Sequence, residues 1–311
     1  MEVYGPVPSR RLGKSLGINN IPYKVCSYSC IYCQVGKAVK MNIKRQEFHK
    51  PDDIVKEVKN KLKNIKHRNK LPDYLSIVPD GEPTLDINLG ELIQKLKKLE
   101  FPVAVISNSS LIQFPDVQKD LFNADYVSLK IDTVNPQIWK KLNKPYKELN
   151  LENILDGISL FTKKFNGCFV TETMMVKGIN DSTEEAIKTA RFISNINPKI
   201  AYIAIPVRPP AYAQVKPANH ENIINNYTNF KEYIENVELL TGYEGNAFSS
   251  TGNLEKDILS ISAVHPLRED AINELQKQTN DNNEVLNKLI NENLIKQVKY
   301  RGHNYYIRKF K

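Results

Sequence analysis

From residue 73 to residue 207, short apolar runs alternate with longer segments in which apolar residues recur every three or four positions. Runs rich in Val and Ile are typical of buried strands, and the longer spacing is typical of amphipathic helices. The predicted strands are 74–78, 103–107, 126–131, 169–176 and 200–207, with a first strand near 15–18. The predicted helices are 51–65, 89–99, 115–121, 151–164 and 182–193.

Alternation of strands and helices predicts an α/β fold in which parallel strands are joined by helical crossovers. About six such units fit the pattern, either as a doubly wound open sheet or as a complete or partial (βα) barrel. In each of these folds, ligands bind at the carboxyl ends of the strands. Polar residues that follow the predicted strands are therefore candidates for the functional site.

The pattern changes after Gly245. Residues 246–253 are small and polar and are predicted to form a linker. Helices are predicted at 254–261, at 266–278 and from Asp281, and a β-hairpin is predicted from 294–299 and 305–309 with a turn at 301–304. Three short helices followed by a hairpin predict a winged-helix-like domain at 246–311, after a larger domain at 1–245.

The charge balance permits a polyanionic partner without requiring one. The 311 residues include 44 Lys and Arg against 35 Asp and Glu, a net charge of +9, and these charges are spread along the chain. Such an excess is found both in nucleic-acid-binding proteins and on ordinary solvated surfaces. No apolar run approaches the roughly 18–20 residues that span a bilayer, and the N-terminus lacks an apolar signal core. We expect a cytoplasmic protein without a membrane segment.

Cysteine is scarce and unevenly placed. Three of the four cysteines, Cys26, Cys30 and Cys33, fall within eight residues. Crowded thiols suggest a metal site rather than a disulfide framework. The alternatives are an iron–sulfur cluster, a zinc site and buried thiols. Zinc usually takes four ligands, commonly in paired CxxC motifs, and no second pair is present. Cys168 lies at the start of a predicted strand and is expected to be a small core residue.

The segment Cys26-Ser-Tyr-Ser-Cys30-Ile-Tyr-Cys33 resembles the signature of the radical S-adenosylmethionine (SAM) superfamily. The runs at 4–17, 81–85 and 208–210 are similar to a wybutosine-synthase-related group of Fe–S oxidoreductases. The resemblance covers residues 1 to about 215. It implies a partial (βα)6 barrel and a [4Fe–4S] cluster on the loop after the first strand, held by three thiolates with one iron left for SAM. It also implies a flavodoxin- or ferredoxin-like electron donor.

The same resemblance implies which residues contact SAM. Tyr32 matches the aromatic residue near the adenine, and Asp80-Gly81-Glu82 matches the motif that binds the methionine ammonium, with Asp80 in place of its first glycine. The remaining matches are polar residues at the ends of predicted strands or within them: Ser107, Asn108, Lys130, Asp132 and Glu172. Each of these could instead be a cap, a turn residue or a barrel salt bridge.

Three functions remain open. The first is radical chemistry on RNA, such as tRNA modification, which the charge and the basic, tyrosine-rich tail favour. The wybutosine reaction itself needs a second cluster, and only Cys168 remains for it. The second is the same chemistry on a small molecule, a peptide or a partner enzyme. The third is a non-enzymatic Fe–S protein that senses redox state. Arg10, Arg11 and Arg208 either bind an anionic substrate group or have only structural roles.

Overall fold

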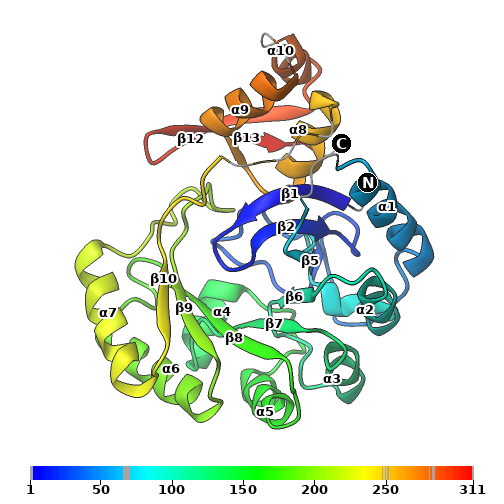
Figure 1. Cartoon of the computed structure of the whole chain (residues 1–311). Helices are drawn as coiled ribbons and strands as arrows, with labels where there is room; N and C mark the ends of the chain where they lie inside the picture. Colours follow the sequence, from blue (N-terminus) through cyan, green and yellow to red (C-terminus); the bar gives the residue numbers. More distant parts are fainter. Residues whose placement is uncertain are drawn as a thin grey trace.

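An eight-stranded sheet organises the chain, as the computed structural model shows (Figure 1). The structure describes residues 3–65, 71–246, 248, 250, 252–279, 281 and 284–309. The strand order is β1-β2-β5-β6-β7-β8-β9-β10; strands β2 to β10 are parallel, and β1 is antiparallel to β2. The strands are β1 (Val3–Ser9), β2 (Gly13–Ile18), β5 (Tyr74–Ile77), β6 (Val103–Ser107), β7 (Tyr126–Lys130), β8 (Cys168–Met174), β9 (Ile200–Ala204) and β10 (Val237–Leu240).

Helices follow the parallel strands and cover the outer face of the curled sheet (Figure 1). Side chains fill its inner face, so the central strands are buried on both sides and read as continuous apolar runs. The predicted α/β fold with a partial barrel is therefore confirmed. The helices are α1 (Pro51–Lys63), α2 (Leu89–Lys97), α3 (Pro115–Leu121), α4 (Pro136–Asn143), α5 (Leu151–Thr162), α6 (Thr183–Asn195) and α7 (His220–Tyr233), with a 3-10 turn η2 (Pro83–Leu85) after β5.

The hairpin formed by β1 and β2 closes part of the barrel. Its tip places Leu12 in a buried cluster with residues of β6 to β9, among them Ala104, Tyr126 and Tyr202. Arg10, also at the tip, donates to the carbonyl of Leu240 at the end of β10. The hairpin thus connects the first and last strands of the sheet and encloses the space between them.

The C-terminal unit contains three helices and a three-stranded antiparallel sheet in the order β11-β13-β12. It packs on β1, because Tyr4 and Val7 share one buried cluster with its apolar residues (Figure 1). Arg301 and Gly302 form the hairpin turn with φ values of 48° and 82°, a left-handed geometry that glycine favours. The elements are α8 (Leu254–Val264), β11 (Leu267–Arg268), α9 (Glu269–Thr279), α10 (Glu284–Asn291), β12 (Ile295–Tyr300) and β13 (His303–Arg308).

The structure adds elements that the sequence pattern did not reveal, namely β1, β10, β11, α4 and α7. The winged-helix class and the boundary at residue 246 stay predictions. Parts of the predicted linker and the start of the third tail helix fall on residues 247, 249, 251, 282 and 283, which lie outside the described residues. Among the described residues, no helix combines the length and apolarity that crossing a membrane requires.

Candidate functional site

The loop that carries the three cysteines rests on the end of α4. The amide of Ser29 lies 3.1 Å from the carbonyl of Asn143, and the amide of Ile31 lies 2.9 Å from the carbonyl of Leu142. The last carbonyls of a helix have no partner within it, so they are available to bind amides of the loop. The loop is therefore held in place by backbone contacts that do not depend on its cysteines.

A contact between two aromatic side chains also holds the same loop in place. The indole nitrogen of Trp139, on α4, donates to the hydroxyl of Tyr28 at 3.1 Å. The two rings meet edge to face with centroids 6.0 Å apart. Both side chains are buried, so this contact combines apolar burial with a satisfied polar group.

Each of the three cysteine sulfurs has a polar donor from outside the loop. The donor atoms are Asn108 Nδ2, 3.4 Å from Cys26 Sγ; Asn143 Nδ2, 3.5 Å from Cys30 Sγ; and Lys24 Nζ, 3.3 Å from Cys33 Sγ. Hydrogen bonds to sulfur tune the potential of iron–sulfur clusters, and a thiolate accepts them better than a thiol does. Three sulfurs on one loop, each with a donor, are a fitting ligand set for a [4Fe–4S] cluster.

Two of the three thiols hold their protons tightly, and the described cysteines are not placed to share a single ion. Burial raises the pKa of both Cys26 and Cys30 to about 12, with Glu82 and Asp132 respectively adding to the effect. These thiols therefore stay protonated at neutral pH unless a metal replaces the proton. In a tetrahedral zinc site the sulfurs lie about 3.8 Å apart. Among the described residues, no group of three His, Cys, Asp or Glu side chains is placed to hold a single ion.

Cys168 does not contribute to this site. It opens β8 and pairs in register with Tyr126, the first residue of β7. Both therefore lie at the amino ends of their strands, whereas the cysteine loop contacts residues at the carboxyl ends. Cys168 is partly buried rather than fully buried. Cys168 was expected to be a small core residue, and it instead packs at the edge of the buried cluster that contains Tyr126.

Glu82 connects the loop after β5 to the end of β6. Its carboxylate accepts hydrogen bonds from Ser107 Oγ at 2.7 Å, from the Asn108 amide at 2.8 Å and from Thr84 Oγ1 at 2.7 Å. Burial raises the pKa of Glu82, and these donors oppose that shift. The predicted residues Glu82, Ser107 and Asn108 thus form one connected group beside Cys26.

Gly81 allows the loop after β5 to approach the strand that leads into Cys26. A Cβ atom at Gly81 would lie 2.1 Å from the carbonyl oxygen of Val25, so no larger residue fits there without movement. Asp80 points elsewhere, because its carboxylate accepts from Asn19 Nδ2 at 3.1 Å. Burial raises the pKa of Asp80 to about 6. Asp80 therefore lies apart from the group around Glu82.

A second group of predicted residues lies at the ends of the neighbouring strands β7 and β8. Lys130 Nζ is 2.8 Å from Glu172 Oε1 and 4.7 Å from the centroid of the Tyr32 ring. Tyr32 donates its hydroxyl proton to Asp132. Arg11 forms an ion pair with Glu172 from the tip of the N-terminal hairpin. These contacts join β7, β8 and the tip of the N-terminal hairpin to the cysteine loop.

Sequence reasoning missed two residues that contact the cysteine sulfurs. Asn143 and Lys24 supply donors to sulfur, but neither lies at the end of a predicted strand. A signal for α4 was present, since Asn135 followed by Pro136 is a common helix start. Asn135 does cap this helix, and its side chain accepts from the amide of Gln137 at 2.9 Å.

The tyrosines of the tail differ from the prediction that they are available to stack on bases. The hydroxyl of Tyr300 donates to the carbonyl of Pro206 at 2.8 Å, and that of Tyr305 donates to Val207 at 3.0 Å. Tyr306 is buried at 4% exposure. These tyrosines therefore take part in the packing of the C-terminal unit, on the loop after β9 and in its own core. The local sequence does not reveal these long-range contacts.

Comparisons with known proteins agree with this geometry. The family model for the radical SAM superfamily matches residues 20–190. A UPF0026 protein of Methanocaldococcus jannaschii is 44% identical over 310 residues, which are 99% of this chain and 96% of the relative. A UPF0026 protein of Helicobacter pylori strain J99 is 35% identical over 222 residues, 70% of each chain. The structure of TYW1 with a lysine-pyruvate adduct bound has a similar fold, with a TM-score of 0.55, 16% identity and coverage of 72% of this chain and 76% of that one.

Proposed function

The chain belongs to the radical SAM superfamily, whose enzymes use a [4Fe–4S] cluster and SAM, and we propose that Cys26, Cys30 and Cys33 hold the cluster and that the enzyme removes a hydrogen atom from a substrate carbon. When bound, the reduced cluster and SAM supply a 5′-deoxyadenosyl radical, which takes that atom and becomes 5′-deoxyadenosine. The carrying observation is the set of three sulfurs on one loop, each with its own donor.

The residues of the barrel have distinct parts in this proposal. Glu82 offers a buried carboxylate to the ammonium of SAM, and its bonds to Ser107 and Asn108 fix its orientation. Gly81 lets the loop that carries Glu82 pack against the Val25 carbonyl, and Asp80 supports this loop through Asn19.

Tyr32 and its neighbours form the second part of the proposed SAM site. The Tyr32 ring supports the adenine, and it is fixed by Asp132 through its hydroxyl and by Lys130 over its face. Glu172 orients Lys130 and keeps it charged, since it raises the pKa of Lys130 against the effect of burial. Lys130 and Asp132 are then positioned to meet the carboxylate and ribose of SAM.

Anaerobic reconstitution tests this function. The protein is loaded with iron and sulfide, reduced with dithionite and given SAM, and 5′-deoxyadenosine is measured by chromatography. We expect release of 5′-deoxyadenosine from the wild type and none from Cys33→Ala. Cys168→Ala serves as the matched control and should behave as the wild type. An intact cluster that never cleaves SAM would contradict the proposal and favour a redox-sensing protein. A flavodoxin- or ferredoxin-like donor should replace dithionite.

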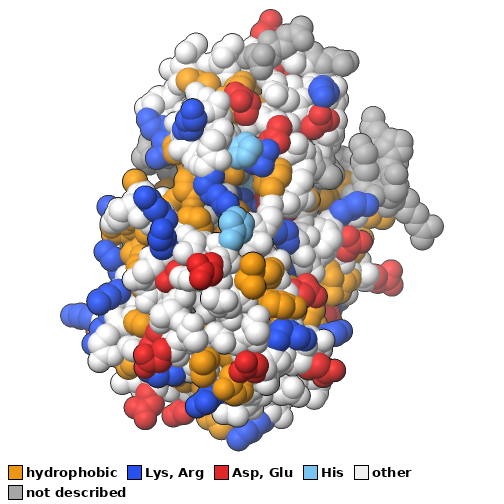
Figure 2. Space-filling model, turned by 90° about the vertical axis from the view of Figure 1, so that its left-hand side faces the viewer, with side chains coloured by type: hydrophobic (Ala, Val, Ile, Leu, Met, Phe, Trp, Pro, Cys, Tyr) orange, Lys and Arg blue, Asp and Glu red, His pale blue; other side chains and the backbone are white. Residues whose placement is uncertain are grey.

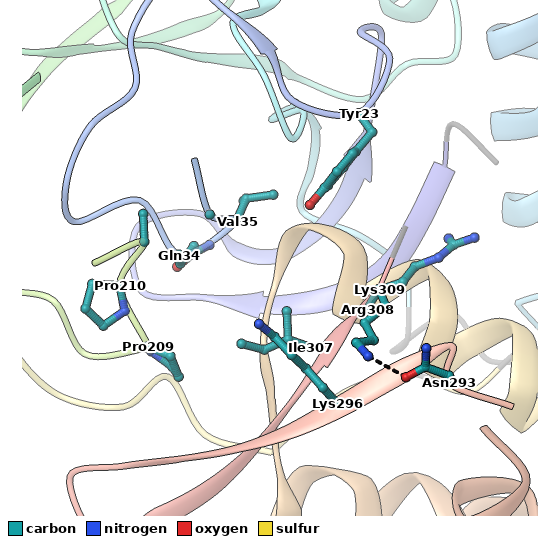
Figure 3. A pocket seen from close by; sticks show the side chains of 12 residues that line it. Tyr23, Gln34, Val35, Pro209, Pro210, Asn293, Lys296, Ile307, Arg308 and Lys309 are labelled. Atoms are coloured by element: carbon teal, nitrogen blue, oxygen red, sulfur yellow. Dashed lines mark hydrogen bonds between the residues drawn. The ribbon is translucent and has the colours of Figure 1, made fainter. Parts of the chain in front are cut away.

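RNA is a second candidate substrate class, and one feature favours it. A groove of about 500 Å³ lies between the cysteine loop and the C-terminal hairpin. Figure 3 shows Lys296, Arg308 and Lys309 on one side of it and Tyr23 and Gln34 on the other. Positive side chains along a groove suit a phosphate backbone. On the face in Figure 2, Lys and Arg are interspersed with Asp and Glu.

Binding of tRNA to the reconstituted enzyme tests this candidate. If the groove binds RNA, affinity should fall steeply between 50 and 200 mM salt, by about tenfold or more. Lys296→Gln should weaken binding and reduce the salt dependence, whereas Lys119→Gln on α3 should do neither. No binding at low salt would remove RNA as the substrate without affecting SAM cleavage.

A further inference from the structure

A chamber of about 120 Å³ lies inside the barrel, beneath the cysteine loop. Its walls come from four separate parts of the chain: the tip of the N-terminal hairpin, the residue after Cys33, the loop after β9 and the C-terminal unit. The polar side chains that matter here are Arg10, Arg11, Gln34, Arg208, Glu244 and His265. This volume accepts a small group, and part of the chamber is open to solvent.

Positive charge exceeds negative charge around this chamber. Three guanidinium groups line it, and the only lining carboxylate among the described residues is Glu244. Arg11 forms an ion pair with Glu172, and Glu172 forms a second ion pair with Lys130. Counting Glu172, Lys130 and Asp132, whose carboxylate also acts on Lys130, gives four cations against three carboxylates, a surplus of one positive charge. Buried charges normally have partners, so this surplus points to an anionic ligand.

His265 does not add to the positive charge at neutral pH. Burial lowers its pKa to about 4, with Arg208 contributing in the same direction. Its Nε2 atom lies 2.7 Å from Glu244 Oε1, and Glu244 also pairs with Arg208. His265 is therefore an uncharged neighbour of the Glu244 carboxylate.

Arg208 has an unused donor. Its side chain is 91% buried, with 9% exposure. One terminal nitrogen donates to Gln34 Oε1 at 2.6 Å, and the other bonds to Glu244. Its Nε atom has no hydrogen-bond partner among the residues that the structure describes. A buried donor without a partner is costly, by about 1–3 kcal/mol, and an oxyanion in the chamber would satisfy it.

Arg10 shows the same imbalance. It lines the chamber, and its hydrogen-bond partners among the described residues are backbone carbonyls, those of Leu240 and of Gly242, the latter at 3.2 Å. Burial and the nearby charge of Arg208 lower its pKa, and Glu172 and Glu244 only partly oppose this shift. Neutral carbonyls at the end of β10 orient this guanidinium without neutralising it.

We propose that the chamber binds an oxyanion group, a carboxylate or a phosphate, of the substrate whose hydrogen atom is removed. Guanidinium groups match the geometry of either anion with paired hydrogen bonds. Gln34, the residue after Cys33, accepts a hydrogen bond from Arg208. An anion held by Arg10 and Arg208 therefore lies next to the proposed cluster loop. The assignment of the ligand as substrate rests on the proposed function, whereas anion binding does not.

Calorimetric titration of the reconstituted holoenzyme with SAM present tests the chamber, with inorganic phosphate and propionate as separate probes. We expect one equivalent of at least one probe to bind, and the preferred probe identifies the anion class. Arg10→Gln and Arg208→Gln should each weaken binding about tenfold or more, and Arg208→Lys should weaken it less. Arg191→Gln, on the exposed side of α6, is the matched control.

The iron–sulfide absorbance of each variant reports whether it has folded, and Arg10→Gln keeps the test valid if Arg208→Gln does not fold. Failure of both probes to bind the wild type overturns the proposal, and so does equal binding by Arg10→Gln and the wild type. An enzyme that releases 5′-deoxyadenosine without binding either anion overturns only the chamber. An enzyme that binds the anion and never cleaves SAM overturns only the proposed function.

Discussion

The Nδ2 atom of Asn143 lies 3.5 Å from the Sγ atom of Cys30, although 113 positions separate the two residues. The same nitrogen is 2.7 Å from Asp132 Oδ2. The asparagine thus links the sulfur of a proposed cluster ligand to the residue that fixes Tyr32. A single amide at the end of α4 couples the two halves of the candidate site.

Replacing Asn143 with Leu should lower the reduction potential of the cluster. A hydrogen bond to a thiolate ligand stabilises the more negative, reduced cluster, so its loss favours the oxidised state. The potential is measured by titration followed by electron paramagnetic resonance. Asn123→Leu, at the exposed end of α3, is the control and should leave the potential unchanged. An unchanged potential in Asn143→Leu would show that the contact does not reach the cluster.

Substitution of each of the four cysteines by serine should distinguish the proposed cluster ligands from Cys168. Cys26→Ser, Cys30→Ser and Cys33→Ser should each lose most of the iron and sulfide, because three thiolates are the minimum protein ligand set for this type of cluster. Cys168→Ser should retain wild-type iron, since it lies at the opposite end of the strands. Iron and sulfide are counted per chain after anaerobic reconstitution. Full iron content in Cys33→Ser, or zinc in the wild type, contradicts the assignment.

Most strands and helices of the barrel, and the candidate cysteine site, could be predicted because their signals are local in the sequence. Strand β6 (Val103–Ser107) is a continuous apolar run, and the cysteine spacing lies within eight residues. Strand β1 was missed because its sequence contains Pro6 and Pro8, which usually argue against a strand. The arginine chamber could not be predicted, because Arg10, Arg208 and Glu244 come from separate loops that only the folded barrel brings together.

Adding a methyl group at Gly81 should weaken both SAM binding and cluster loading. A Cβ atom there would meet the Val25 carbonyl at 2.1 Å and the Ile21 side chain at 2.8 Å, which displaces the strand that leads into the first cysteine. Overpacking of this kind costs about 1–3 kcal/mol. Gly242→Ala is the matched control, since its Cβ would meet open space. SAM affinity and iron content equal to those of the control would contradict this role for Gly81.

Asp80→Asn should stabilise the protein at neutral pH. Burial raises the pKa of Asp80 to about 6, so the folded state binds a proton that the unfolded state has lost. Stability therefore falls as the pH rises from about 4 to about 6 and then stays level. The neutral variant avoids this loss, which is at most about 3 kcal/mol at 1.36 kcal/mol per pKa unit. Thermal midpoints at pH 4 and pH 7 measure it, and Asp156→Asn, on the surface of α5, should show no such gain.

Glu172→Gln should destabilise the protein at pH 7 and somewhat less at pH 3.5, where Glu172 is still ionised in the folded state. Burial alone would raise the pKa of Glu172, but Arg11 and Lys130 outweigh it and hold the pKa well below its usual range. The carboxylate therefore stabilises the fold above the unfolded pKa of about 4.3, and this contribution is lost as the pH falls below that value. Because the variant leaves two buried cations without their carboxylate, we expect a loss of about 3–5 kcal/mol at pH 7. Anaerobic urea unfolding at pH 7 and pH 3.5 measures the difference. Glu184→Gln removes an exposed carboxylate that pairs with Lys188 and should have a far smaller effect at both pH values; equal effects of the two variants would show that the buried pair does not stabilise the barrel.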